Sequence, residues 1–376
     1  MPVRPELPDI PFQDLVTHHQ TLAHELEAAV MRVAASGSYI LGTEVAAFER
    51  EAAVALGATH AVGLSSGTDA LLAILMALGI GRGDEVVTTP FSFFASAGVI
   101  ERLGAIPVFA DIDPETFNLD SDAAVARIGR HTKAVVAVHL FGRVARLPSL
   151  EALCAAEQIP LVEDAAQAIA ACGDNSRWGR RVGTIGRAAS LSFFPSKNLG
   201  AMGDGGMVIT SDGALADRLR LLRVQGAKPK YHHPMVGGNF RLDEIQAAVL
   251  RVKLPHLFYW SERRRQIAAR YRAALANTPM GLPPEDPGSV WSQFVIRVRN
   301  GRRDALANHL KSKRIATAIY YPEPLHLQPC FAHLGYRVGH FPQAERACSE
   351  ALALPIYPEL GEDAVDRICD TIKSFS

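Results

Sequence analysis

The chain has 376 residues, enough for roughly two or three domains with sizeable cores. Its 39 lysines and arginines balance its 39 aspartates and glutamates, so the formal net charge is zero, and the sequence contains no basic run. This balance excludes the electrostatic footprint of a nucleic-acid-binding protein. Hydrophobic residues make up 48% and charged residues 21%, which excludes long disorder, a collagen-like chain and a coiled coil.

Membrane segments and disulfides are not expected. The longest apolar stretch, residues 70–78, is too short to span a bilayer, and the first residues lack the apolar core of a signal peptide. We therefore expect a cytoplasmic protein without a membrane partner. The five cysteines are odd in number, widely spaced and without a Cys-x-x-Cys pair, so we expect reduced thiols and no thiolate metal site.

Between residues 61 and 224, apolar β-type runs alternate with helical patterns. Strands are predicted over residues 61–65, 85–89, 107–110, 134–140, 160–163, 188–194 and 207–210. Helices are predicted over residues 69–78, 95–103, 149–157 and 214–224. The alternation is typical of βαβ units and predicts an α/β fold with a mostly parallel sheet.

The pattern changes after Leu254. A charged helix is predicted over residues 261–276, and a stretch rich in proline and glycine, a strand over 293–298 and a helix-rich tail follow it. This pattern predicts a smaller α+β domain packed against the first one. We place the boundary near residue 250, which gives a large domain over residues 1–250 and a small domain over residues 251–376.

The first motif is a Ser-Ser-Gly-Thr turn, residues 65–68, between an apolar strand and a helix. The first N–H groups of a helix have no partner within it, and the helix dipole favours an anion there. Gly67 lets the backbone approach a phosphate closely, and Thr68 adds a hydroxyl. The alternative is that Ser66 or Thr68 simply caps the helix.

The second motif is Glu-Asp-Ala-Ala-Gln, residues 163–167, at the end of a predicted buried strand. Ligands of open α/β sheets bind at the carboxyl ends of the strands, so Asp164 is expected to face that crevice. Its carboxylate could hold a cationic ring nitrogen, and Gln167 could donate a hydrogen bond to a nearby oxygen. The alternative is that Asp164 caps a following helix.

The third motif is Ser-Phe-Phe-Pro-Ser-Lys, residues 192–197, which follows an apolar strand. Burial there lowers the pKa of the Lys197 amine and makes it a nucleophile that can form a Schiff base. The alternative is a lysine on a surface loop. The glycines of residues 200–206 precede a strand rather than a helix, so they are not a dinucleotide-binding loop.

A phosphate cradle, an acid for a pyridinium nitrogen and a lysine for a carbonyl are the parts that pyridoxal 5'-phosphate needs. On this series of motifs the chain resembles the DegT-type nucleotide-sugar aminotransferases along nearly its whole length, with most likeness to the branch that aminates carbon 3 of the sugar. Further matching motifs are Gly-Ser-Tyr-Ile-Leu-Gly-Thr-Glu-Val (37–45), Gly-Asp-Glu-Val-Val (83–87), Ile-Asp-Pro-Glu-Thr (112–116), Gly-Asp-Gly-Gly (203–206), Asn-Phe-Arg-Leu-Asp-Glu-Ile-Gln-Ala-Ala (239–248), Tyr-Tyr-Pro-Glu-Pro-Leu-His (320–326) and Leu-Pro-Ile-Tyr-Pro (354–358).

The resemblance implies the aspartate-aminotransferase fold (fold type I) and a role for each matching residue. Lys197 would carry the cofactor as a Schiff base, Asp164 would hold the pyridine nitrogen and Gln167 the ring hydroxyl. The phosphate would be held by Gly67, Thr68 and Ser192, and Phe93 would stack on the ring. The alternative for Phe93 is core packing.

The resemblance also implies a homodimer with shared active sites. Asn239 would reach the phosphate from the other subunit, and Arg241 would lie beside the substrate unless it forms a surface ion pair. Tyr320, Tyr321 and the loop residues Lys230 and His232 would contact the sugar nucleotide, although the loop could equally be a solvated one. No metal is expected at His232 and its histidine neighbour, because no third ligand is near in sequence.

The implied reaction has two stages: an amino acid, expected to be L-glutamate, converts the cofactor to pyridoxamine 5'-phosphate, which then aminates a UDP- or dTDP-linked 3-keto-sugar. Lys197 would take the α-proton as a base. The alternatives are a carbon-4 aminotransferase, or a regulatory or dehydratase protein on the same scaffold. The lysine favours transamination, because dehydratase relatives have a histidine at that position. Desulfurase chemistry is disfavoured, because no cysteine lies in a glycine-rich catalytic loop.

Overall fold

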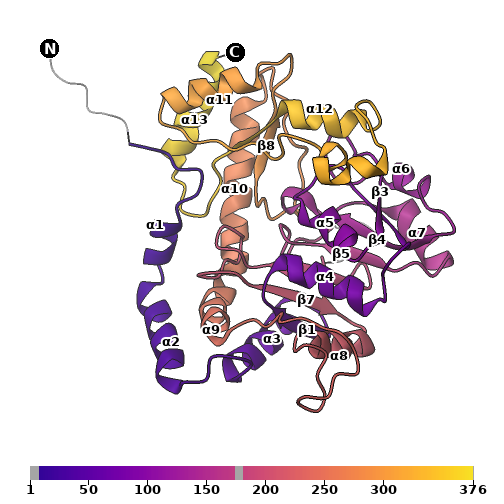
Figure 1. The fold of residues 1–376 in the computed structure, drawn as a ribbon. Coiled ribbons are helices and arrows are strands. Elements are labelled where there is room, and N and C mark those ends of the chain that lie inside the picture. Colours follow the sequence, from indigo (N-terminus) through magenta and orange to yellow (C-terminus); the bar gives the residue numbers. More distant parts are fainter. Residues whose placement is uncertain (1–7, 174–180, 376) are drawn as a thin grey trace.

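A seven-stranded sheet forms the centre of the protein in a computed structural model that describes residues 8–173 and 181–375 (Figure 1). Its strands are β1 (His60–Leu64), β2 (Glu85–Thr88), β3 (Ile106–Phe109), β4 (Thr132–Val138), β5 (Leu161–Asp164), β6 (Ala188–Ser192) and β7 (Gly206–Thr210). Their order across the sheet is β1-β7-β6-β5-β4-β2-β3. Strands β2 to β6 pair in parallel, and β7 runs antiparallel to β1 and β6. The predicted seven strands and the mostly parallel sheet are confirmed.

The helices pack on both faces of this sheet and around a second, two-stranded antiparallel sheet of β8 (Phe294–Arg297) and β9 (Ala351–Leu354). The helices are α1 (Leu15–Gln20), α2 (Ala23–Ser36), α3 (Thr43–Leu56), α4 (Gly67–Ala77), α5 (Ala95–Arg102), α6 (Ser121–Val125), α7 (Pro148–Ala156), α8 (Gly213–Leu222), α9 (Glu244–Lys253), α10 (Leu257–Leu275), α11 (Arg303–Ser312), α12 (Pro342–Glu350) and α13 (Glu362–Phe375). Within the described ranges, no helix has the length and apolar character needed to cross a membrane.

The central strands are apolar on both faces because both faces are covered, as parallel sheets require. Val208 of β7 packs in the layer formed by α4, α5 and α8, whereas its neighbour Ile209 packs in the opposite layer with α3 and α9. A third core joins β8, β9, α10, α11 and α13, and it includes Ile10 from the N-terminal segment. In Figure 1 the C-terminal elements, in orange and yellow, gather at the upper end of the molecule.

Helix α10 begins earlier than the charged pattern at residues 261–276 predicted. The helix starts at Leu257. Leu257 and Trp260 pack in the core that includes α3 and α9, and the charged residues come later in the chain. The pattern of charge therefore located most of this helix and missed its first turn, in which Leu257 and Trp260 are buried.

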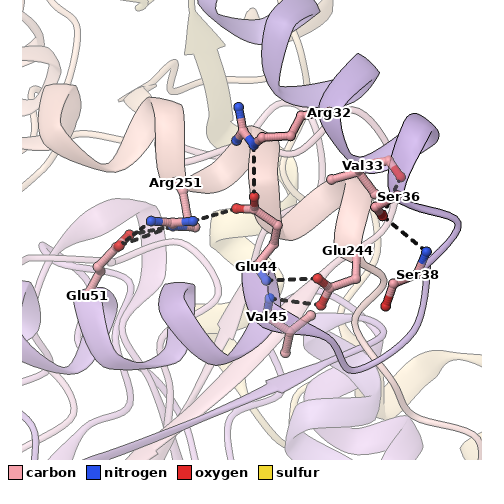
Figure 2. A network of polar contacts seen from close by, with 9 residues as sticks. All are labelled: Arg32, Val33, Ser36, Ser38, Glu44, Val45, Glu51, Glu244 and Arg251. Carbon is pink, nitrogen blue, oxygen red and sulfur yellow. Dashed lines mark hydrogen bonds and ion pairs between the residues drawn. The ribbon is translucent and has the colours of Figure 1, made fainter.

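Helix α3 is attached to α9 by a carboxylate rather than by a cap of its own (Figure 2). Glu244, the first residue of α9, is buried and accepts hydrogen bonds from the N–H groups of Gly42 at 2.7 Å, Glu44 at 2.8 Å and Val45 at 2.9 Å. These donors belong to the open N-terminus of α3, where the helix dipole favours a negative charge. On the same two helices, Arg251 donates to Glu44 at 2.5 Å.

Replacing Glu244 with alanine would leave these N–H groups buried without an acceptor. We expect the free energy of unfolding to fall by about 3 kcal/mol, since hydrogen bonds to a buried charged group are costly to remove. Urea unfolding monitored by circular dichroism measures the change. Glu51→Ala, which removes a more exposed partner of Arg251, is the control and should cost less than about 1 kcal/mol. Equal losses in the two variants would contradict this account.

Candidate active site

A cavity of about 430 Å³ opens at the carboxyl ends of the parallel strands. Nine of the residues proposed from the sequence line it, and these are Gly67, Thr68, Phe93, Asp164, Gln167, Ser192, Lys197, Tyr320 and Tyr321. They come from the start of α4, from the loop after β2, from the ends of β5 and β6 and the loops after them, and from the C-terminal part of the chain. The sheet therefore brings together motifs that are far apart in the sequence, at the edge where open α/β sheets bind ligands.

The start of α4 offers unused donors of the kind that make an anion cradle. Ser66 caps the helix and accepts a hydrogen bond from Asp69 N–H at 3.0 Å, so the capping alternative holds for this residue. The N–H groups of Gly67 and Thr68 nevertheless bond to no described residue. A Cβ at Gly67 would lie 2.6 Å from Ser192 Cβ, so the cradle stays open because this position is glycine.

Asp164 ends β5 and is 7% exposed. Its Oδ1 accepts from Ala166 N–H at 3.2 Å, and its Oδ2 accepts from the Ser96 hydroxyl at 2.7 Å. The residues after it form a turn rather than a helix, so the helix-cap alternative for Asp164 is wrong. The carboxylate is held by two donors and lines the cavity.

Glu163, the acid before it, is fully buried and has a different function. Its carboxylate accepts from His139 Nε2 at 2.9 Å and from the N–H groups of Gly183, Ile185 and Gly186 at 2.8, 3.0 and 2.7 Å. Successive residues of a strand point to opposite faces, so the two acids are separated. Glu163 supports the loop that leads into β6, and Asp164 lines the cavity.

Gln167 has a fixed amide orientation. Its Oε1 accepts from Phe141 N–H at 2.8 Å, so its Nε2 donates to the Tyr321 hydroxyl at 3.0 Å. Burial raises the pKa of Tyr321 above its ordinary value, so this phenol stays protonated. Gln167 thus presents an amide donor, not its carbonyl oxygen, toward the tyrosine side of the cavity.

Lys197 lies in the loop after β6, and its N–H donates to Phe194 O at 2.8 Å. Burial lowers the pKa of its amine to about 8, against the opposing influence of the Asp164 carboxylate. An amine with this pKa is neutral, and therefore nucleophilic, in a much larger fraction near neutral pH than an exposed lysine. The alternative of a surface-loop lysine is wrong, because the side chain lines the cavity.

Phe93 is 58% exposed and lies at the cavity, so the core-packing alternative is wrong for it. Four other proposed residues lie outside the cavity of this single chain. Asn239 is exposed and its Oδ1 accepts from Arg241 Nε at 2.7 Å. Lys230 lies 5.0 Å from the ring centroid of Tyr231 on an exposed loop that also carries His232.

Several residues that line or support the cavity were not predicted from the sequence. Ser92, Asp204 and Gln293 line it, and Ser96 lies behind it. The Gly-Asp-Gly-Gly motif contained Asp204 without indicating a function for it. Ser92 and Ser96 follow β2, and nothing local in the sequence shows that β2 lies beside β4 and close to β5.

Comparison with known proteins gives matches over almost the whole chain. The DegT/DnrJ/EryC1/StrS aminotransferase family model matches residues 20–373. A protein of Geobacillus stearothermophilus named "Pleiotropic regulatory protein" is 46% identical over 98% of each chain. The dTDP-3-amino-3,4,6-trideoxy-alpha-D-glucose transaminase of Streptomyces venezuelae is 42% identical over 100% of this chain and 98% of its own.

Among solved structures, S. venezuelae DesV in complex with a ketimine intermediate superposes with a TM-score of 0.94 at 42% identity, covering 98% of this chain and 99% of that one. The mixed α/β fold with its mostly parallel sheet is thus that of known aminotransferases. The chain belongs to the DegT/DnrJ/EryC1/StrS aminotransferase family.

Proposed function

We propose that the protein is a pyridoxal 5'-phosphate-dependent aminotransferase that moves an amino group from L-glutamate to carbon 3 of a nucleotide-linked keto-sugar. The observation that carries the proposal is a single cavity that holds the Lys197 amine, the Asp164 carboxylate and the open N-terminus of α4. The relative from Streptomyces venezuelae is named a 3-amino-sugar transaminase, which supports the position of the new amine.

The donors and acceptors of the cavity fit this cofactor. The N–H groups of Gly67 and Thr68, with the hydroxyls of Thr68 and Ser192, would hold the phosphate, since the cradle is open and its N–H groups bond to no described residue. Asp164 would hold the ring nitrogen as a cation. Gln167 would donate to the ring hydroxyl, and Phe93 would cover the ring.

The bound cofactor supplies an electron sink for the carbanion that forms at the substrate α-carbon. Lys197 would attach the cofactor through its amine. Once that amine is released, it lies in the cavity as a base whose lowered pKa suits proton transfer near neutral pH. In the first stage it would take the α-proton of the amino donor and pass it to the cofactor, and in the second stage it would return a proton to the sugar carbon that receives the amine.

We further propose a homodimer with shared active sites. Asn239 and Arg241 lie outside the cavity of their own chain, and each forms an isolated β-bridge, with Val224 and Leu64 respectively. This placement supports a contribution to the cavity of a partner subunit, with Asn239 toward the phosphate and Arg241 toward the substrate. The exposed loop with Lys230 and His232 would face the nucleotide diphosphate, and Tyr320 and Tyr321 would face the sugar.

The first test is the absorbance spectrum of the cofactor-loaded protein before and after L-glutamate. The proposal predicts loss of the band of the lysine-bound cofactor and growth of the pyridoxamine band. UDP- and dTDP-linked 3-keto-sugars, but not 4-keto-sugars, should then restore the first band. A spectrum that no amino donor changes would favour a regulatory protein, and restoration by 4-keto-sugars alone would overturn the carbon-3 assignment.

Lys197→Ala should lower the transamination rate by about 10³-fold or more, since it removes both the attachment point and the base. Lys373→Ala, at an exposed lysine of α13, is the matched control and should retain the wild-type rate. Comparable rates in the two variants would refute the role of Lys197.

Gly67→Ala should weaken binding of the cofactor about tenfold or more, because the new methyl group would press on Ser192 and narrow the anion cradle. Fluorescence titration of cofactor-free protein with pyridoxamine 5'-phosphate measures the dissociation constant. Gly81→Ala is the control, because a Cβ there meets nothing within 4 Å. Equal affinities in both variants would show that the cradle does not hold the phosphate.

The pKa of Lys197 predicts a pH dependence. The neutral amine attacks the aldehyde, so the rate of cofactor attachment should rise with pH and level off above about 8, rather than near the ordinary lysine value. Asp164→Asn removes the influence that raises this pKa, so its profile should shift to lower pH. Stopped-flow absorbance of cofactor-free protein measures both profiles. A wild-type midpoint near 10 would contradict the effect of burial.

A further inference from the structure

Behind the cavity wall, two serine hydroxyls connect to the Asp164 carboxylate. Ser92 lines the cavity and is 3% exposed, whereas Ser96, on the first turns of α5, is fully buried. The two hydroxyl oxygens are 2.9 Å apart, and Ser96 Oγ lies 2.7 Å from Asp164 Oδ2. This pair lies outside the sequence motifs that predict the cofactor site.

The direction of the hydrogen bonds follows from the carboxylate. An ionised carboxylate accepts hydrogen bonds and donates none, and a serine hydroxyl has a single hydrogen. Ser96 therefore gives its hydrogen to Asp164, and Ser92 must donate to Ser96. The series runs from Ser92 through Ser96 to Asp164 Oδ2, while Ala166 N–H occupies Oδ1.

Two consequences follow for the carboxylate. A donated hydrogen bond stabilises its charged form in a buried place, where an unpaired charge is costly. It also fixes the rotation of the carboxylate relative to the Lys197 amine and the Tyr321 hydroxyl, whose pKa values both respond to the charge of Asp164. Both effects act on the group proposed to hold the ring nitrogen.

We propose that Ser96 is a positioning residue that acts through Asp164. Its hydroxyl holds this carboxylate in the rotation that faces the ring nitrogen of the cofactor, and Ser92 orients the hydroxyl of Ser96. The inference rests on the proposed function, because it assigns Ser96 a share in the recognition of the cofactor ring. It concerns the ring nitrogen alone, and not the phosphate cradle or the lysine.

The test compares two ligands on full-length, cofactor-free protein: pyridoxamine 5'-phosphate and its analogue with a CH group in place of the ring nitrogen. Ser96→Ala should weaken binding of pyridoxamine 5'-phosphate about tenfold, the effect of one hydrogen bond to a charged group. It should leave the affinity for the analogue within about twofold of wild type, since no nitrogen remains for Asp164 to hold. Ser92→Ala should give a smaller loss of the same kind.

Ser190→Ala is the matched control. Ser190 is an equally buried serine on β6, directly opposite Asp164 in the ladder, but its hydroxyl donates to the main-chain oxygen of Glu163 at 3.4 Å. The Ser190→Ala variant should bind both ligands with the same affinity as wild-type protein. Binding of the analogue also reports that each variant has folded.

Equal weakening for both ligands in Ser96→Ala would overturn the inference, because the hydroxyl would then support only the shape of the cavity. Unchanged affinity for both ligands would overturn it as well. In either case wild-type protein would still prefer the ligand with the nitrogen, and the proposed function would stand. Wild-type protein that binds neither ligand would overturn the proposed function together with this inference.

Discussion

The arrangement of the cavity depends on the buried carboxylate of Glu163. Ala145 N–H donates to Nδ1 of His139 at 3.0 Å, so Nε2 of the same ring carries the hydrogen that it donates to Glu163. With three further donors from the loop before β6, the carboxylate joins the end of β4 to the entry of β6 across β5. A buried charge of this kind is tolerated because it is fully hydrogen-bonded.

The contacts of Glu163 fix the strand ends that position the groups of the proposed chemistry. Asp164 is the next residue along β5, and Lys197 follows β6 by a short loop. Keeping the two strands in register brings an acid and an amine to the same cavity, close enough for the carboxylate to raise the pKa of the amine. The amine then keeps a pKa of about 8, because the burial that lowers it outweighs the nearby carboxylate.

The sequence allowed prediction of those parts of the site that follow from local patterns. Lys197 and Asp164 each come after an apolar strand, and Gly67 opens a helix, so each could be assigned to the same sheet edge. Ser96 could not be found in this way, because its contact depends on the order of the strands. The antiparallel direction of β7 was not predictable either, since an apolar run has the same appearance in both directions. Asn239 and Arg241 lie outside the cavity, and the resemblance rather than any pattern of residues indicated them.

The anion cradle has one more physical property. Among the described residues that line the cavity, Lys197 is the sole cation, and the cradle itself offers N–H groups and hydroxyls. Attraction between two ions weakens as mobile salt ions surround them, whereas short hydrogen bonds from fixed neutral donors are screened much less. The proposed cradle would therefore select a phosphate by the geometry of its donors rather than by neutralising its charge. Ionic strength should accordingly have little influence on the contribution of this cradle to binding.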